Sequence, residues 1–120
     1  MNKSTITFDN LATNLDLFND LMDNELFFEA HEIMENVWIF FKENNHPFEK
    51  LSKGLTNAAI SLEHIKRNTK GAKRKALITM GAFDRFKNNL DMQVEFYDYF
   101  SSSTRLVENF KKRYKYIFNS

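Results

Sequence analysis

Two residues in the segment 25–38 have the types and the spacing for chemistry. His31 and Glu35 stand four positions apart, so on a helix their side chains lie one turn apart on the same face and can touch. A carboxylate beside an imidazole favours its protonated form or chelates a metal ion with it. An unpaired carboxylate is costly to bury, so we expect Glu35 to have a partner.

The spacing of this pair leaves three interpretations open. In the first, His31 and Glu35 form a structural ion pair or hydrogen bond that joins two helices. In the second, they bind a metal ion, with His64 or Asn57 of another helix completing the ligand set. The sequence has Glu35 where the H-E-x-x-H zinc pattern has its second histidine. In the third, His31 acts as a general acid or base with Glu32 or Glu35.

The elements that must position these residues are predicted to be helices. One proline and three glycines leave long stretches without helix breakers, and no segment alternates with the period of a strand. The sequence therefore predicts an all-α fold, a compact bundle of about five helices in a single domain over residues 1–120. The expected helices cover residues 10–22, 25–43, 47–67, 70–90 and about 102–117, and residues 91–100 are ambiguous.

Local signals indicate where several of these helices begin and end. Asp9 or Asn10 can cap the first helix, and Thr69 can cap the fourth. Pro47 suits the first turn of the third helix. Asn68 suits a left-handed residue that ends it.

The third predicted helix has two faces for packing and should be the central one. One face carries large residues, and the other carries Gly54, Asn57, Ala58 and Ser61. Because small side chains let a neighbour approach closely, we expect the helix over 25–43 to pack on the small-residue face. That placement brings Asn57 and His64 toward His31 and Glu35.

Other conspicuous residues have simpler interpretations. Trp38 shares a stripe of helix 25–43 with His31 and is expected in the core, with its indole N–H bound to an acceptor. His46 lies in a polar loop and is expected to be solvated. The bases between residues 66 and 75 are expected on an outer face. They could bind phosphate, but no aromatic residue alternates with them, which argues against nucleic acid as a partner.

Charge is distributed unevenly along the chain. Residues 1–35 contain eight acids and one base, whereas residues 66–87 contain eight bases and one acid. Such a dipolar molecule can steer an anion toward its basic end or associate head to tail with a second copy. Oppositely charged, solvated helix faces explain the same pattern.

The sequence also bears on the compartment. It contains no cysteine, so any metal site would use histidines and carboxylates. No apolar run approaches the roughly 18 residues of a membrane span, and no signal peptide is visible near residue 1. We expect a cytoplasmic protein without a membrane partner.

Four segments together resemble a known family. They are FEAHEIMENVW at 28–38, GLTNAA at 54–59, HIKR at 64–67 and GA at 71–72. This pattern is similar to the prokaryotic family catalogued as domain of unknown function 309, over about residues 25–77. Asn57 stands where that family has a glutamine, and Asn68 and Thr69 stand where it has glycine and asparagine.

The resemblance implies a compact helical bundle with one shared polar site and assigns no reaction or cofactor. The implied site consists of His31, Glu32, Glu35, Trp38, Asn57 and His64. We therefore expect a bacterial helical bundle whose site between the second and third helices binds a small molecule or has a structural role. The alternative is a hydrolase, metal-assisted or acid-base, that uses His31 and Glu35.

Overall fold

Helices make up most of the protein in the computed structural model, which describes residues 4–118. They are α1 (Leu11–Asp23), α2 (Phe27–Glu43), α3 (Glu49–Arg67), α4 (Ala72–Phe86), the short 3₁₀ helix η1 (Lys87–Asn89), α5 (Tyr97–Arg113) and α6 (Lys115–Phe118). Residues 4–118 contain no strand. The predicted all-α bundle is confirmed, with α6 as a sixth, single-turn helix.

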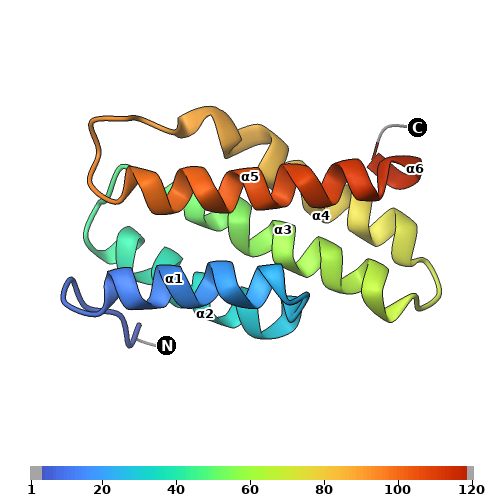
Figure 1. Ribbon diagram of the computed structural model, residues 1–120, viewed down its shortest axis with the longest axis horizontal. Helices are drawn as coiled ribbons and strands as arrows, with labels where there is room; N and C mark the ends of the chain where they lie inside the picture. The colour runs from blue at the N-terminus through green and yellow to red at the C-terminus, as the bar shows by residue number, and fades with distance from the viewer. Residues whose placement is uncertain (1–3, 119–120) are drawn as a thin grey trace.

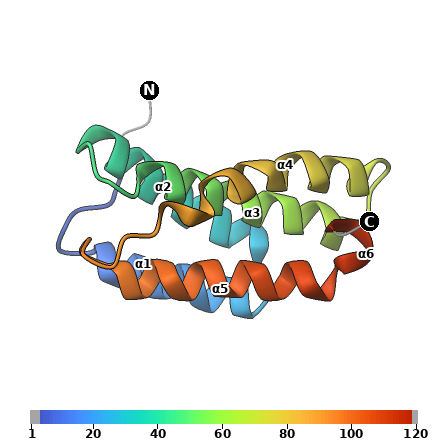
Figure 2. The ribbon, with the colours of Figure 1, turned by 90° about the horizontal axis from the view of Figure 1, so that it is seen from above.

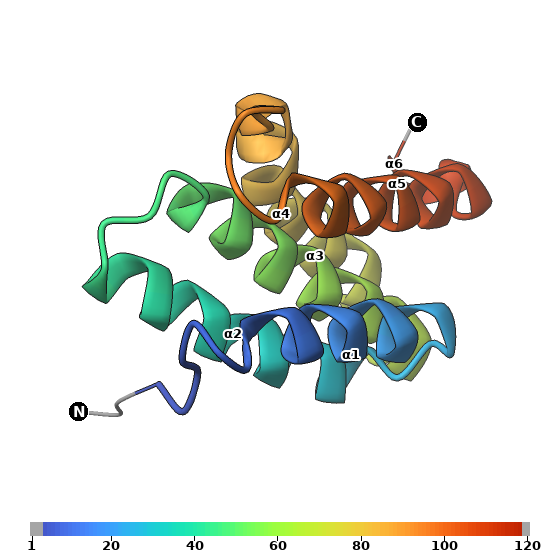
Figure 3. The ribbon, with the colours of Figure 1, turned by 60° about the vertical axis from the view of Figure 1, so that its left-hand side comes forward.

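The helices form two layers, and α3 is the central helix, as predicted. α2, α3 and α4 lie side by side in one layer, and α1 and α5 lie next to each other across it (Figures 1 and 2). Figure 3 shows α3 between α2 and α4. Within residues 4–118, no helix combines the length and the apolar character that crossing a membrane requires.

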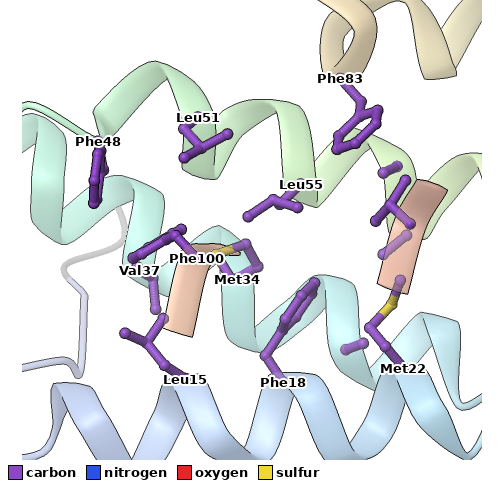
Figure 4. Close-up of a cluster of buried hydrophobic side chains, with 14 of the residues drawn as sticks. Leu15, Phe18, Met22, Met34, Val37, Phe48, Leu51, Leu55, Phe83 and Phe100 are labelled. Atoms are coloured by element: carbon purple, nitrogen blue, oxygen red, sulfur yellow. The ribbon is translucent and has the colours of Figure 1, made fainter. Parts of the chain in front are cut away.

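Aromatic side chains fill much of the core between these layers. The fully buried phenylalanines are Phe18, Phe27, Phe41, Phe48, Phe83 and Phe100. The large-residue face of α3, with Leu51 and Leu55, packs among them (Figure 4). The periodicity of large apolar residues thus identified the inward face of this helix correctly.

The small-residue face of α3 packs against α4, so its predicted pairing with α2 is wrong. A β-carbon on Gly54 would lie 3.2 Å from backbone atoms of Ala82 and Phe83 in α4. The hydroxyl of Ser61 donates a hydrogen bond of 2.6 Å to the carbonyl of Ala76. Small residues allow a close approach by any helix, and here α4 approaches with Ala76 and Ala82.

Two of the predicted helix caps also differ from the structure. Asn10 precedes α1, but its side chain accepts a hydrogen bond from the backbone N–H of Thr7 instead of capping the helix. Gly71, with φ of 76°, precedes α4, and Thr69 contributes its carbonyl to the N–H of Ala72. Asn68 does end α3 in the left-handed conformation, with φ of 49°.

The ambiguous segment resolves into a loop followed by an early start of α5. The helix begins at Tyr97 rather than near residue 102, directly after Phe96 with φ of 72°. It ends at Arg113, and Tyr114 separates it from α6. The predicted fifth helix is therefore two helices, and this break decides where Tyr114 and Tyr116 lie.

Candidate functional site

His31 is half-buried on α2, and a hydrogen bond to the preceding turn of the helix orients its ring. Its Nδ1 atom lies 2.7 Å from the backbone carbonyl oxygen of Phe28. A carbonyl oxygen only accepts hydrogen bonds, so Nδ1 carries the proton of the neutral ring. The lone pair is consequently on Nε2, which can accept a hydrogen bond or bind a proton.

His31 and His64 line one hollow, which we call the histidine hollow. Its volume is about 210 Å³, and its lining residues are Phe28, His31, Ile60, Glu63, His64 and Arg67. The first two come from α2 and the others from the last turns of α3. The predicted proximity of these two histidines is present, although the small-residue face does not create it.

The remaining charges of the histidine hollow balance each other. Nε of Arg67 lies 2.6 Å from a carboxylate oxygen of Glu63. The same guanidinium lies 5.5 Å from the ring centre of Phe28, within the range of a cation–π contact. The Arg67–Glu63 pair is neutral as a whole, so it adds no net charge to the histidine hollow.

Glu35, Glu32 and Asn57 do not line the histidine hollow. Glu35 and Glu32 are exposed, and Asn57 is half-buried. Within residues 4–118, the carboxylate of Glu35 forms no hydrogen bond or ion pair, and neither does that of Glu32. The expected buried partner of Glu35 is therefore wrong. The inward face of α2 is centred on Ala30, Met34 and Val37, and Glu35 lies beyond its edge.

The family comparison covers this same region of the chain. A family model described as domain of unknown function (DUF309) matches residues 15–75, which is half of the 120-residue chain. The chain belongs to this family. The resemblance inferred from residues 25–77 is thereby confirmed. No curated protein and no solved structure matches the chain.

The part matched by the DUF309 family contains every residue of the histidine hollow and also Trp38, which lies elsewhere. The indole N–H of Trp38 donates a hydrogen bond of 3.1 Å to the carboxylate of Glu49, at the opposite end of the α2–α3 interface. The ammonium groups of Lys42 and Lys53 lie 5.8 and 5.6 Å from its ring. The predicted acceptor for this N–H is present, but the ring is half-buried rather than part of the core.

The metal site considered from the sequence is not assembled. In the part of the chain that the structure describes, no three side chains of His, Cys, Asp or Glu converge closely enough to hold a metal ion. His31 and His64 share the histidine hollow, but Glu35 is outside it. The six predicted site residues thus divide into the two histidines, which line the hollow, and four residues that do not, namely Glu32, Glu35, Trp38 and Asn57.

His46 has a structural role that the sequence did not reveal. Its ring stacks on Phe41, with centroids 4.0 Å apart and planes inclined by 11°. Its Nδ1 accepts a hydrogen bond of 3.0 Å from the backbone N–H of Phe48, which precedes α3. The expected solvated loop residue is instead half-buried. The position of His46 next to Pro47 in the sequence does not indicate that its ring turns back onto α2.

The half-buried ring of His46 makes the stability of the protein sensitive to acid. Burial lowers the pKa of His46 from its ordinary 6.5, and the charge of Glu95 opposes this by a smaller amount. Between the lowered pKa and 6.5, the unfolded chain binds a proton that the folded protein does not. The free energy of unfolding therefore falls as the pH drops through 6.5 and below.

We expect the substitution His46→Asn to remove this pH-dependent part of the stability. An asparagine oxygen can accept the N–H of Phe48 but does not titrate, so the variant should lose less stability than the wild type as the pH falls from about 7.5 to 5. Urea unfolding at several pH values measures the difference. Parallel pH profiles of the two proteins would contradict it. The variant should be less stable at every pH because the stack on Phe41 is lost.

Proposed function

We propose that the histidine hollow binds a small ligand that combines an apolar part with a hydrogen-bond donor. The observation that carries the proposal is the orientation of His31, whose bond to the carbonyl of Phe28 leaves Nε2 as an acceptor. Phe28 and Ile60 provide apolar surface beside it, and His64 provides a second imidazole. A few polar groups placed within apolar walls are typical of small-molecule sites.

The size and charge of the hollow narrow the ligand class. Its volume of about 210 Å³ is below the roughly 300–1,000 Å³ of pockets for drug-sized ligands. Since Arg67 is paired with Glu63, the imidazoles of His31 and His64 are the polar groups that a ligand meets. A single ring or short chain with a hydroxyl or amide fits these properties better than a large anion.

The contacts of His31 favour ligand binding over a purely structural role. A structural histidine at this interface would bond across to α3, whereas the hydrogen bond of His31 stays within α2. The hydrolase alternative depends on His31 acting with Glu35, and these carboxylate and imidazole groups share neither a hollow nor a hydrogen bond. Small-ligand binding is therefore the function that the geometry supports best.

A matched pair of probes tests the proposal. Phenol and anisole have similar rings, but only phenol donates a hydrogen bond. We expect phenol to shift the imidazole NMR signals of His31 and His64 and to bind about fivefold more tightly than anisole, since one hydrogen bond contributes about 1 kcal/mol. The variant His31→Leu should remove this preference.

The third histidine of the chain provides the control. Signals of His46 should not shift with phenol, and His46→Asn should keep the preference for phenol over anisole. A wider set of small aromatic hydroxyls and amides extends the test beyond one compound. If none of them shifts His31 and His64 in a saturable way, or if His46 responds equally, the proposed site is wrong.

A further inference from the structure

Two basic segments that are distant in the sequence meet at one end of the bundle. The turn between α3 and α4 lies next to α6 and the end of α5 (Figures 1 and 2). The first segment supplies Lys66, Lys70, Lys73 and Arg74, and the second supplies Lys112 and Lys115. Within residues 4–118, none of these six side chains is paired with a carboxylate. The ammonium of Lys66 instead donates a hydrogen bond of 2.6 Å to the backbone carbonyl of Glu25, which does not cancel its charge. Among residues 4–118, this end of the molecule therefore carries an excess of positive charge.

A hollow opens between these two segments, and we call it the basic recess. Its volume is about 420 Å³, and its polar lining consists of Lys66, Asn68, Lys73, Tyr114 and Tyr116. No carboxylate from the part of the chain that the structure describes lines it. A volume of this size is within the range of ordinary ligand sites, so the recess can admit a group as large as a planar base.

The cations and the aromatic rings of the basic recess are close together. The ammonium of Lys73 lies 5.5 Å from the ring centre of Tyr116. The rings of Tyr114 and Tyr116 meet edge to face at 6.3 Å, and Tyr116 is 61% exposed. The recess thus places an exposed aromatic ring within a few ångströms of a positive charge.

We infer that the basic recess binds a nucleotide unit, with its base on the ring of Tyr116 and its phosphate beside Lys66 and Lys73. Lysine ammonium groups bind phosphate oxygens, and nucleic-acid bases stack on aromatic rings. The sequence argument against nucleic acid rested on the lack of aromatic residues within the basic run. Tyr114, between α5 and α6, and Tyr116, within α6, supply them.

A recessed aromatic site favours a nucleotide over a lipid surface. Membrane-binding surfaces carry apolar side chains that project into the lipid boundary. In the basic recess, the tyrosine rings line a hollow and are flanked by lysines. The unit that fits is a planar ring joined to a phosphate, whether in a free nucleotide or in a single strand.

Binding is tested with the full chain and five probes. They are a labelled 12-residue oligo-uridylate, the matching oligo-thymidylate, adenosine monophosphate, inorganic phosphate, and vesicles containing an anionic phospholipid. We expect binding of at least one nucleotide probe, and binding of adenosine monophosphate, if present, should exceed that of inorganic phosphate. If only the oligonucleotides bind, the natural ligand is a nucleic acid strand. If adenosine monophosphate binds with similar affinity, the natural ligand is a free nucleotide.

Two pairs of variants locate the site. Tyr116→Ala should weaken nucleotide binding at least about fivefold, whereas Phe8→Ala, which removes another exposed ring, should not. Lys73→Gln should reduce the salt dependence of strand binding by about 0.7 in the log–log slope. Lys42→Gln, an exposed lysine near Trp38, should leave it unchanged. Circular dichroism checks that each variant is folded.

Several results would overturn the inference. Binding to vesicles without binding to any nucleotide probe would assign this end of the molecule to membranes. Equal affinity for phosphate and for adenosine monophosphate, with no effect of Tyr116→Ala, would show that no base is bound. If the recess variants and their controls lose the same amount of binding, the probes bind to the positive charge of the protein in general and not to the basic recess. The absence of binding to every probe would also exclude the proposed nucleotide site.

Discussion

Substitution of Phe100 by alanine is expected to lower the free energy of unfolding by about 3–5 kcal/mol. Phe100 is fully buried on α5. Its ring centre lies 5.0 Å from that of Phe48 and 5.8 Å from that of Phe41. The phenylalanine therefore joins α5 to both α2 and the start of α3 (Figure 4). Its removal leaves a cavity among rings that cannot all collapse into it.

Denaturant unfolding, followed by circular dichroism, measures this loss. Phe8→Ala is the matched control, because Phe8 is 57% exposed and its edge-to-face contact with Phe40 is worth about 1 kcal/mol. A loss at Phe100 no larger than the loss at Phe8 would show that the core is not organised around α5 as described.

Residue periodicity predicted the individual helices well. The spacing of Leu11, Leu15, Phe18 and Met22 placed α1 and its buried face correctly, because a helix brings every third or fourth residue to one side. The same argument placed the core faces of α3 and α4. These predictions succeed because a single helix and its burial are local properties.

Which helix covers which face could not be predicted in the same way. The small-residue face of α3 was assigned to α2, yet Gly54 and Ser61 contact α4. Glu35 was expected to be buried with His31 because both lie near one stripe of α2, but a residue at the edge of a stripe is exposed when no helix covers it. Both results depend on the packing of three helices, which spacing along one helix does not determine.

The two hollows show the same limit for candidate sites. His31 and His64 were predicted to be near each other through the small-residue face of α3 and through the family pattern, and the histidine hollow contains both. The basic recess was not predicted, because Tyr114 and Tyr116 lie about 40 positions beyond Lys73 in the sequence and reach it only through the break after α5. The cytoplasmic location and the bacterial origin remain predictions from the sequence.

Substitution of Ser61 by leucine should destabilise the protein by about 3 kcal/mol. Ser61 is fully buried between α3 and α4, and its hydroxyl lies 2.6 Å from the carbonyl of Ala76. Leucine removes this hydrogen bond and adds volume that the interface cannot take, and the two effects are worth about 1 and 1–3 kcal/mol. The interface has little free space, since even a β-carbon at Gly54 would lie 3.2 Å from the backbone of α4.

Two further serine variants separate these effects when unfolding is measured under the same conditions. Ser61→Ala loses the hydrogen bond without adding volume and should cost about 1 kcal/mol. Ser102→Leu places the same leucine at an exposed position of α5 and should change stability by less than about 0.5 kcal/mol. If Ser61→Leu is as stable as Ser61→Ala, α4 moves away from α3 at little cost. The small residues of α3 would then not be needed for the close approach of the two helices.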